Sequence, residues 1–434
     1  FCISVTAADE TRHRIFILSA AAAAVILRPK ITGNAVIGGR RKHRSSTHSR
    51  MKLRNLLFRL LAGALCLVLF NEFFVYYLVL LECQWPTKPH PVNGQEPVKV
   101  MLLADTHLLG PIHGHWFDKL RREWQMHRTF QSAMTLFRPE AVFVLGDIFD
   151  EGNWVNQKEF DAYVDRFRKL FHTPEGTQLY SIVGNHDIGF HYATHPYLTH
   201  RFGKAFNNTG VTMTSIRGVN FVAINSVAME GDGCQLCETA EKELRGISAI
   251  FKCGRGVGHG CKSVPKLEEY SRPIVLQHYP MYRESDRACQ EYDAPQIELY
   301  RERWEVISKE STDLIGELIN PRLSFSGHTH HYCHVAKNRL GIEEYTLASF
   351  SWRNKNNPSF VLAQISPSEH TIARCQMPVE NTIINIYLVG GIVLVLSSIL
   401  RLGSFVSQLR IFSRGGRREY RKLANTSANK LPRD

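Results

Sequence analysis

The central part of this 434-residue chain lacks an excess of basic residues, although the whole chain carries a formal net charge of +13. Residues 60–400 hold 32 Lys and Arg against 36 Asp and Glu, so the positive charge lies at the two ends. Nucleic-acid binding depends on clustered Lys and Arg that contact phosphates, so nucleic acid is not expected as a partner. The chain also shows no internal repeat, so a repeat array is not expected.

The basic ends flank two apolar runs, Leu60 to Leu81 and Ile383 to Leu400. At 1.5 Å per residue these runs span about 33 and 27 Å, close to the roughly 30 Å hydrocarbon core of a bilayer. Residues 1–59 carry 12 Lys and Arg against two acids, and residues 401–434 carry nine against two. Basic segments stay on the cytoplasmic side. We therefore expect a multi-pass membrane protein with two transmembrane helices, two cytoplasmic ends and a lumenal domain over residues 82–382.

A cleaved signal peptide and a core helix are the alternatives for these runs. The first run exceeds the usual signal length and no small-residue cleavage site follows it. A basic tail follows the second run, which argues against a core helix. Glu72 within the first run costs about 2.5–3.5 kcal/mol in a bilayer, so we expect a partner helix or a protonated carboxyl there. Residues 1–50 are interpreted as disordered, as a targeting extension or as a gene-model artefact, with Met51 as a natural start.

Eight of the ten cysteines lie in the expected lumenal domain, an even number that is typical of a disulfide set. They are Cys83, Cys234, Cys237, Cys253, Cys261, Cys289, Cys333 and Cys375. An oxidising compartment favours disulfides. The alternative is a zinc site formed by Cys234, Cys237, Cys253 and Cys261. The triplet that starts at Asn207 is a glycosylation acceptor on the same side.

Short apolar runs alternate with helical periodicity from Val98 onward, which predicts an α/β fold with buried sheets. We expect strands over residues 98–104, 141–146, 178–183, 219–225, 273–278, 322–326, 345–349 and 359–365. We expect helices over residues 116–137, 158–171 and about 303–319. In an open α/β sheet the carboxyl ends of the strands form a binding crevice.

Five polar clusters follow these strand-like segments. They are Asp105-x-His107, Gly146-Asp147-x-x-Asp150, Gly184-Asn185-His186-Asp187, His278 and Gly327-His328-Thr329-His330. Each cluster alone is common in turns and loops, but their order after successive strands favours a shared site. They offer carboxylate, amide and imidazole ligands without a thiolate, a set that suits two divalent ions sharing one carboxylate. Such a pair, about 3.5–4 Å apart, clamps the attacking and leaving oxygens of a phosphate ester. Glycines before Asp147, Asn185 and His328 are expected to allow tight turns.

The order of these clusters, with Gly152 completing the second, resembles that of the calcineurin-like metallophosphoesterases over residues 98–366. Longer stretches, such as LADTHLLG at 103–110 and SFSWRNKNNPSF at 349–360, resemble the metallophosphoesterase 1 group, the post-GPI-attachment phosphodiesterases. The two flanking membrane helices are similar as well, so the resemblance covers residues 51–400. It implies an α/β protein with a four-layer α/β/β/α sandwich between two transmembrane helices.

The resemblance also implies two metal ions bridged by Asp147. One ion is assigned to Asp105, His107, Asp147 and His330, and the other to Asp147, Asn185, His278 and His328. His186 fits no ligand position and is expected to donate a proton to, or stabilise charge on, the leaving oxygen. Its alternative role is to orient a ligand. Asp150 and Asp187 are interpreted as orienting or turn residues. The ligand types suit Mn, Fe or Zn, and the resemblance indicates Mn²⁺.

The reaction implied by the resemblance is removal of an ethanolamine-phosphate side branch from GPI anchors after attachment, which aids export of GPI-anchored proteins. His115, Trp352 and Arg353 are candidate substrate contacts, with ordinary packing as the alternative. The implied location is ER exit sites, the ER–Golgi intermediate compartment or the cis-Golgi. Contacts of the cytoplasmic tail with a cargo receptor or coat are expected, although residues 429–434 lack the dilysine-type signal that is frequent in this group.

Alternatives to this function remain open at the level of sequence. A phosphomonoesterase, a nuclease or another phosphodiesterase would use the same fold, although the charge of the central segment disfavours a nuclease. A non-catalytic lumenal cargo adaptor that only binds metal belongs to a different class. The complete ligand set with His186 present argues against this adaptor.

Overall fold

A computed structural model describes residues 41–90, 95–208, 210–258 and 260–428 of the chain. The expectations for residues 1–40 and 429–434 lie outside these ranges. The chain divides into two compact units. One comprises residues up to Val75 together with those from Asn381 onward, and the other is Tyr76–Glu380.

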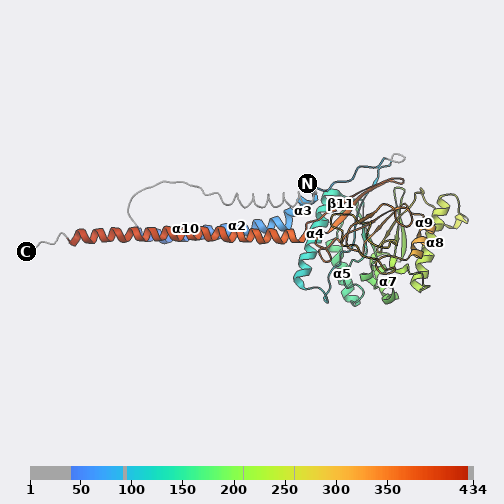
Figure 1. Cartoon of the computed structure of the whole chain (residues 1–434), viewed down its shortest axis with the longest axis horizontal. Helices are drawn as coiled ribbons and strands as arrows, with labels where there is room; N and C mark the ends of the chain where they lie inside the picture. Colours follow the sequence, from blue (N-terminus) through green and yellow to red (C-terminus); the bar gives the residue numbers. More distant parts are fainter. Residues whose placement is uncertain (1–40, 91–94, 209, 259, 429–434) are drawn as a thin grey trace, which may run out of the picture. The chain divides into compact units, whose positions relative to one another are not determined.

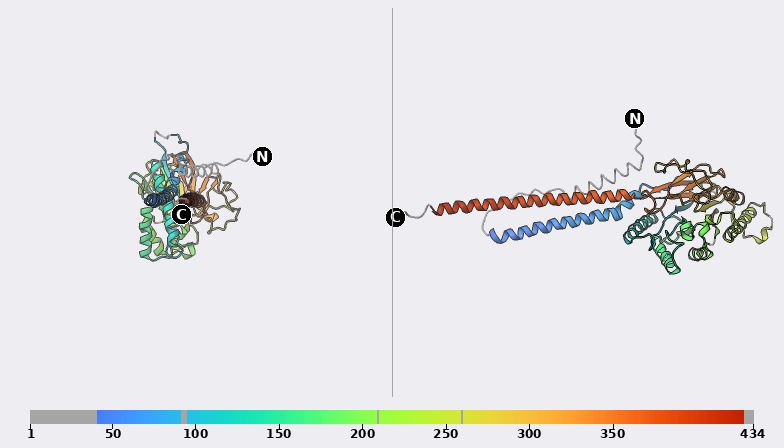
Figure 2. Two further views of the ribbon diagram at one scale, coloured as in Figure 1. Left: turned by 90° about the vertical axis from the view of Figure 1, so that its left-hand side faces the viewer. Right: turned by 60° about the horizontal axis from the view of Figure 1, so that its bottom comes forward.

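The first unit contains long helices. Helix α2 (Arg41–Leu69) continues through a π-helical turn (Phe70–Phe74) into α3 (Val75–Leu80), which belongs to the second unit from Tyr76 onward. Helix α10 spans Glu380–Ala428. The stretches Leu53–Leu80 and Glu380–Ser404 are long and apolar enough to cross a membrane. Only 11% of the second stretch is buried, which argues against a core helix. The first stretch begins seven residues before the predicted span and ends one residue before its end, and the second extends beyond the predicted span at both ends. Figure 2 shows α2 and α10 side by side.

Glu72 has a partner on the neighbouring helix. The Tyr387 hydroxyl donates a hydrogen bond to Glu72 Oε1 at 2.6 Å. The two helices approach closely at Gly63, where a Cβ would lie 2.5 Å from Leu394 Cδ2. Small residues permit such close contact between apolar helices. The partner-helix expectation for Glu72 therefore agrees with the structure.

The Tyr76–Glu380 unit contains two mixed β-sheets. The first has the order β11-β10-β1-β2-β3 and the second β4-β5-β6-β7-β9-β8. In the first sheet the strands are β1 (Val98–Leu103), β2 (Ala141–Leu145), β3 (Gln178–Ile182), β10 (Ser359–Ile365) and β11 (His370–Gln376). In the second they are β4 (Val211–Ile216), β5 (Val219–Ile224), β6 (Ile274–Gln277), β7 (Leu323–Ser326), β8 (Cys333–Val335) and β9 (Glu343–Thr346). β1, β2 and β3 run parallel, as do β5, β6, β7 and β9.

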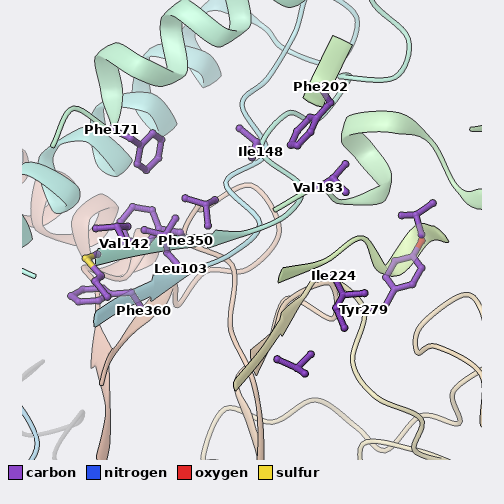
Figure 3. Packing of buried hydrophobic residues seen from close by; sticks show 14 of the residues in the cluster. Leu103, Val142, Ile148, Phe171, Val183, Phe202, Ile224, Tyr279, Phe350 and Phe360 are labelled. Carbon is purple, nitrogen blue, oxygen red and sulfur yellow. The ribbon is translucent and has the colours of Figure 1, made fainter. Parts of the chain in front are cut away.

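The sheets pack face to face between two layers of helices, and this confirms the predicted α/β/β/α architecture. Between the sheets, Phe143 of β2 contacts Phe221 of β5 with ring centroids 4.9 Å apart. Helices α4 (Trp116–Phe137) and α5 (Gln157–Leu170) cover the first sheet, where Phe137 packs on Phe360. Helices α8 (Gln235–Gly254) and α9 (Lys309–Ile319) cover the second. Figure 1 shows α4 and α8 on opposite sides of the strands, and Figure 3 shows packing beside the strands.

The predicted elements agree with the structure within a few residues, except at one helix. The helix expected from residue 303 begins at Lys309, because the Arg303 amide donates to Val306 O at 2.6 Å and closes a turn. The Ser308 side chain then caps α9 by accepting from the Ser311 amide. The prediction missed β4, β8, β11, α8, α6 (Asn185–Ile188) and α7 (Pro196–Phe206).

All eight cysteines of the central part form disulfides. The pairs are Cys83–Cys375, Cys234–Cys237, Cys253–Cys261 and Cys289–Cys333. This agrees with a disulfide set and contradicts a zinc site of four cysteines, because Cys253 and Cys261 pair with each other. Asn207 is exposed at the end of α7, whereas residue 209 of the same triplet lies outside the described residues.

Candidate metal centre

The candidate ligands come from loops at the carboxyl ends of parallel strands in both sheets. Asp105 follows β1 and Asp147 follows β2, while His278 follows β6. The loops after β1 and β2 are joined by backbone hydrogen bonds, from the Asp105 amide to Gly146 O at 3.2 Å and from the His107 amide to Asp147 O at 3.0 Å. The packing of the two sheets thus brings Asp105 and His330, which are far apart in the sequence, close together in space.

The first cluster consists of Asp105, His107, Asp147 and His330, whose ligand atoms all lie within 4.8 Å of one another. His107 Nε2 is 3.2 Å from His330 Nε2 and 3.5 Å from Asp147 Oδ2. His330 Nε2 is 3.6 Å from Asp105 Oδ1. These four side chains are the set assigned to one ion from the sequence.

The second cluster shares Asp147 with the first. It comprises Asp147, His278 and His328. His278 Nε2 lies 3.2 Å from Asp147 Oδ2, 3.1 Å from Asn185 Oδ1 and 3.2 Å from His328 Nδ1. Asn185 therefore joins this cluster through its amide oxygen. The structure brings all seven predicted ligands together, with Asp147 between the two groups.

The outer ring nitrogens fix which imidazole atoms face inward. His278 Nδ1 donates to Leu145 O at 2.8 Å, and His328 Nε2 donates to Trp304 O at 2.6 Å. A neutral imidazole has one proton, so in the neutral form that binds metal the inward atoms His278 Nε2 and His328 Nδ1 carry the lone pairs. These lone pairs and the Asp147 carboxylate favour a positive charge at this point. The donor set therefore fits a divalent cation.

Burial keeps most of these imidazoles neutral. It lowers the pKa of His328 to about 3 and lowers the pKa of His107 below its ordinary value. Neutral imidazole is the form that binds metal. Burial also raises the pKa of Asp105 to about 8, because the nearby His278 does not fully offset the cost of burying the carboxylate. Burial lowers the pKa of His278, but the neighbouring Asp147 carboxylate raises it by more, to about 9. The centre thus favours added positive charge.

A model of the calcineurin-like phosphoesterase family matches residues 98–332, more than half of the chain. The chain belongs to the calcineurin-like phosphoesterases. It is similar to the Metallophosphoesterase 1 homolog of Drosophila melanogaster, with 50% identity over 328 residues, 76% of this chain and 88% of that protein. Metallophosphoesterase 1 of Xenopus laevis is 46% identical over 80% of this chain and 89% of its own length. That of Rattus norvegicus is 44% identical over 83% and 94%.

This phosphoesterase is accordingly a metal-dependent phosphoric ester hydrolase with a two-cluster ligand set. When bound, two divalent cations would supply Lewis-acid polarisation of the phosphate oxygens and an acidified water. The seven side chains described above are the residues that would hold them.

Three glycines of the phosphoesterase bring backbone close to these ligands. Only Gly146 adopts a left-handed conformation, with φ of 86°. The expected tight turns are also present at Gly184 and Gly327, with hydrogen bonds from the Asp187 amide to Gly184 O at 3.2 Å and from the Thr329 amide to Gly327 O at 3.0 Å. Neither of these two positions has space for a Cβ. At Gly327 a Cβ would lie 2.8 Å from Asp105 Oδ2, and at Gly184 it would collide with Asp147.

His186 lies beside the ligands without belonging to either group. Its amide donates to Asp147 Oδ1 at 2.8 Å, and its Nδ1 donates to Asp150 O at 2.8 Å. This leaves Nε2 as the atom that can hand a proton to a leaving oxygen. Burial disfavours the imidazolium, but Asp147 outweighs it and raises the pKa of His186. A raised pKa suits a proton donor at neutral pH.

The two remaining aspartates of the motifs, Asp150 and Asp187, form hydrogen bonds with groups of the site. Asp150 Oδ1 lies 3.1 Å from His107 Nδ1, so it turns the other ring nitrogen inward. Asp187 accepts from the Gly184 amide at 2.9 Å and the Phe149 amide at 3.0 Å. These contacts agree with the orienting and turn roles expected from the sequence.

The three candidate substrate contacts have different surroundings. His115 is exposed and its Nδ1 caps helix α4 by accepting from the Phe117 amide. Trp352 is only 4% exposed and donates from Nε1 to Pro378 O at 2.8 Å, which gives it the packing role. Arg353 approaches the centre, with Nη2 3.4 Å from Asp150 Oδ2.

Sequence reasoning missed two residues beside the centre. The Tyr279 ring lies 4.3 Å from the His328 ring, centroid to centroid. Trp304 touches the same imidazole through its backbone carbonyl. Tyr279 follows the predicted ligand His278 directly, so its position was available from the sequence. The Trp304 contact was not, because a helix was expected there.

Proposed function

We propose that this phosphoesterase is a phosphodiesterase of the early secretory pathway that removes an ethanolamine-phosphate branch from GPI anchors after their attachment to protein. The proposal is supported by the resemblance of long stretches, such as residues 103–110 and 349–360, to the post-attachment GPI phosphodiesterases. The single observation that favours it over a soluble phosphatase is the connection of the domain at both ends to membrane-competent helices, Leu53–Leu80 and Glu380–Ser404.

A lumenal position of the domain is part of this proposal. Four disulfides within residues 83–375 suit an oxidising compartment. The basic residues beyond both helices favour cytoplasmic ends. GPI anchors occupy the lumenal leaflet, so a tethered enzyme would meet them in two dimensions at raised effective concentration. ER exit sites, the intermediate compartment or the cis-Golgi are the proposed location, with GPI-anchored proteins as partners and a cargo receptor or coat at the tail.

We assign separate chemical roles to three residues at or near the candidate metal centre. His186 Nε2 is placed to protonate the departing oxygen, and the Asp147 carboxylate holds the His186 backbone through its amide. Arg353, paired with Asp150, is placed to face the phosphate. No side-chain nucleophile is required, because a hydrolysis of this class proceeds by in-line attack of water. We propose Mn²⁺ as the resident ion, in agreement with oxygen and imidazole ligands.

The test uses the full-length chain, purified with Mn²⁺ and given a GPI glycan that carries an ethanolamine-phosphate branch. Mass analysis should show loss of that branch, and Asp147→Ala should abolish it. Asp161→Ala is the matched control, since Asp161 is exposed on α5 away from the ligands. Undiminished turnover by Asp147→Ala would reject the two-ion site.

Two other functions are distinguished by the same preparation. Faster hydrolysis of a phosphomonoester or another diester than of the GPI glycan would reassign the substrate on the same fold. A non-catalytic cargo adaptor is tested in cells through His186→Ala. If this variant exports GPI-anchored proteins normally while deletion of the protein slows export, binding rather than hydrolysis is the function.

A further inference from the structure

A pocket of about 180 Å³ lies beside the metal centre and is not used by the hydrolysis described above. Its walls combine three aromatic rings, Phe190, Tyr192 and Trp304, with the charged side chains of Glu230 and Arg303. Ligand pockets characteristically pair apolar walls with a few placed polar groups.

The pocket and the metal centre share a wall. Trp304, which lines the pocket, accepts the hydrogen bond of His328 Nε2 through its carbonyl at 2.6 Å. The Tyr279 ring packs against the same imidazole and is only 2% exposed. Its hydroxyl has no hydrogen-bond partner among the described residues.

The aromatic rings form a stepped apolar surface that is open to solvent. The Phe190 and Tyr192 rings are nearly parallel, with an interplanar angle of 7° and centroids 6.0 Å apart. Trp304 lies 5.3 Å from Phe190 and 5.9 Å from Tyr192. Tyr192 is 74% exposed and Trp304 41% exposed. Clustered exposed aromatics mark binding sites, because rings gain most when a second flat apolar surface covers them.

The charged groups around these rings are already paired. Glu230 is buried and lies 3.1 Å from the Arg303 guanidinium. Glu302 accepts from the Lys309 amide at 3.0 Å and lies 3.7 Å from its ammonium. The Glu305 and Arg301 side chains also pair. Among the described residues that line the pocket, the two carboxylates, of Glu230 and Glu302, each have a cationic partner, so a free ammonium group would find no unpaired carboxylate among them. Paired charges still accept and donate hydrogen bonds to hydroxyl groups, which favours a neutral polyol with one apolar face.

The backbone of the pocket is held in an uncommon conformation. Arg303 has a φ of 69°, in the left-handed region that non-glycine residues rarely adopt. Such conformations cluster at ligand sites, where the fold fixes them against their preference. Here the turn that contains Arg303 presents the Trp304 ring to the pocket.

We propose that this pocket binds a pyranose ring of the glycan next to the phosphate ester, with the ring stacked on Tyr192 and its hydroxyls bonded to the Glu230–Arg303 pair. The identity of the sugar as a GPI mannose rests on the proposed function. The presence of a sugar subsite rests on the pocket.

The test measures binding of a phosphate-free mannose trisaccharide to the Mn²⁺-loaded full-length chain in detergent micelles. Saturation-transfer NMR and tryptophan fluorescence should show saturable binding. Tyr192→Ala should weaken it about tenfold, which corresponds to about 1.4 kcal/mol for a lost aromatic stack. Tyr197→Ala is the matched control, because Tyr197 is 48% exposed on α7 and does not line the pocket. Equal melting temperatures show that both variants are folded.

The outcomes separate this inference from the proposed function. Binding that Tyr192→Ala weakens supports the subsite even if the GPI phosphodiester is not hydrolysed. Hydrolysis of the GPI phosphodiester together with trisaccharide binding that is absent, or equal in Tyr192→Ala and wild type, overturns the subsite. Saturable binding of ethanolamine at Tyr192 in place of the trisaccharide also overturns it, since that result would make the pocket an ammonium site.

Discussion

Replacement of Gly327 by alanine tests how closely the strand ends of the two sheets must approach at the metal centre. A Cβ at this position would lie 2.8 Å from Ala104 Cβ, 2.8 Å from Asp105 Oδ2 and 3.2 Å from Leu145 O. Non-bonded heavy atoms prefer separations of about 3.5–4.0 Å. The neighbours would therefore have to retreat by up to about 1 Å, and the carboxylate of a candidate ligand is one of them.

Two effects of Gly327→Ala follow from this displacement. Overpacking of this kind costs about 1–3 kcal/mol, which lowers the melting temperature by roughly 2–4 °C per kcal/mol in a domain of this size. A displacement of about 1 Å at the reacting groups costs on the order of 100-fold in turnover. We expect turnover of a chromogenic phosphodiester and bound metal both to fall in the variant.

The control for this experiment is Gly246→Ala in α8. Nothing lies within 4 Å of a Cβ at that position. Alanine within a helix is favoured over glycine by about 0.5–1 kcal/mol, so this variant should keep its metal and melt no lower than wild type. Wild-type metal content and turnover in Gly327→Ala would refute the close approach of the two sheets at this point.

Three further predictions concern the surroundings of the centre and the stability of the domain. Asp150→Ala removes the carboxylate that orients a ligand imidazole, so Mn²⁺ affinity by titration should fall about 10–100-fold; unchanged affinity would speak against the orienting role. Joint replacement of Cys289 and Cys333 by serine opens a disulfide of sequence separation 44 and should lower the free energy of unfolding by about 4 kcal/mol in denaturant titrations. An unchanged midpoint would contradict this. Burial lowers the pKa of His370 below 6.5, so the unfolded chain takes up its proton first and stability should fall with pH from about 6.5 downward. The melting temperature of His370→Gln should depend less on pH between about 7.5 and 5.5, and parallel curves would exclude this residue as a cause.

The sequence was sufficient to predict the centre because its ligands follow strands that run parallel. Asp105 and Asp147 come after β1 and β2, which pair in parallel register, so their loops must meet at one edge. His278 and His328 obey the same rule after β6 and β7 of the second sheet. What the pattern could not give is the approach of one sheet edge to the other, which depends on the packing between Phe143 and its neighbours.

The failures have identifiable physical reasons. The spacing of apolar residues after Arg303 is compatible with a helix. The backbone is left-handed at Arg303 and extended at Ser308, however, so the helix begins only at Lys309. Trp352 was a candidate substrate contact, with ordinary packing as the alternative. Its indole instead finds a buried carbonyl at Pro378, a long-range contact that no local pattern reports.

The position of strain in this fold indicates which part the metal ions would stabilise. Five of the seven candidate ligands have backbones in the left-handed region. They are Asp105 (φ 55°), His107 (43°), Asp147 (49°), His328 (74°) and His330 (60°). Each such conformation costs about 1–2 kcal/mol, and the strands that precede these loops are buried and regularly paired. Hydrogen bonds from backbone amides to side chains, such as that from the His328 amide to Asp105 Oδ2 at 3.1 Å, hold the loops in place. A ligand that binds only the folded state stabilises that state. Cations bound at this centre would therefore offset the conformational cost of the ligand loops, which the regularly paired strands do not carry.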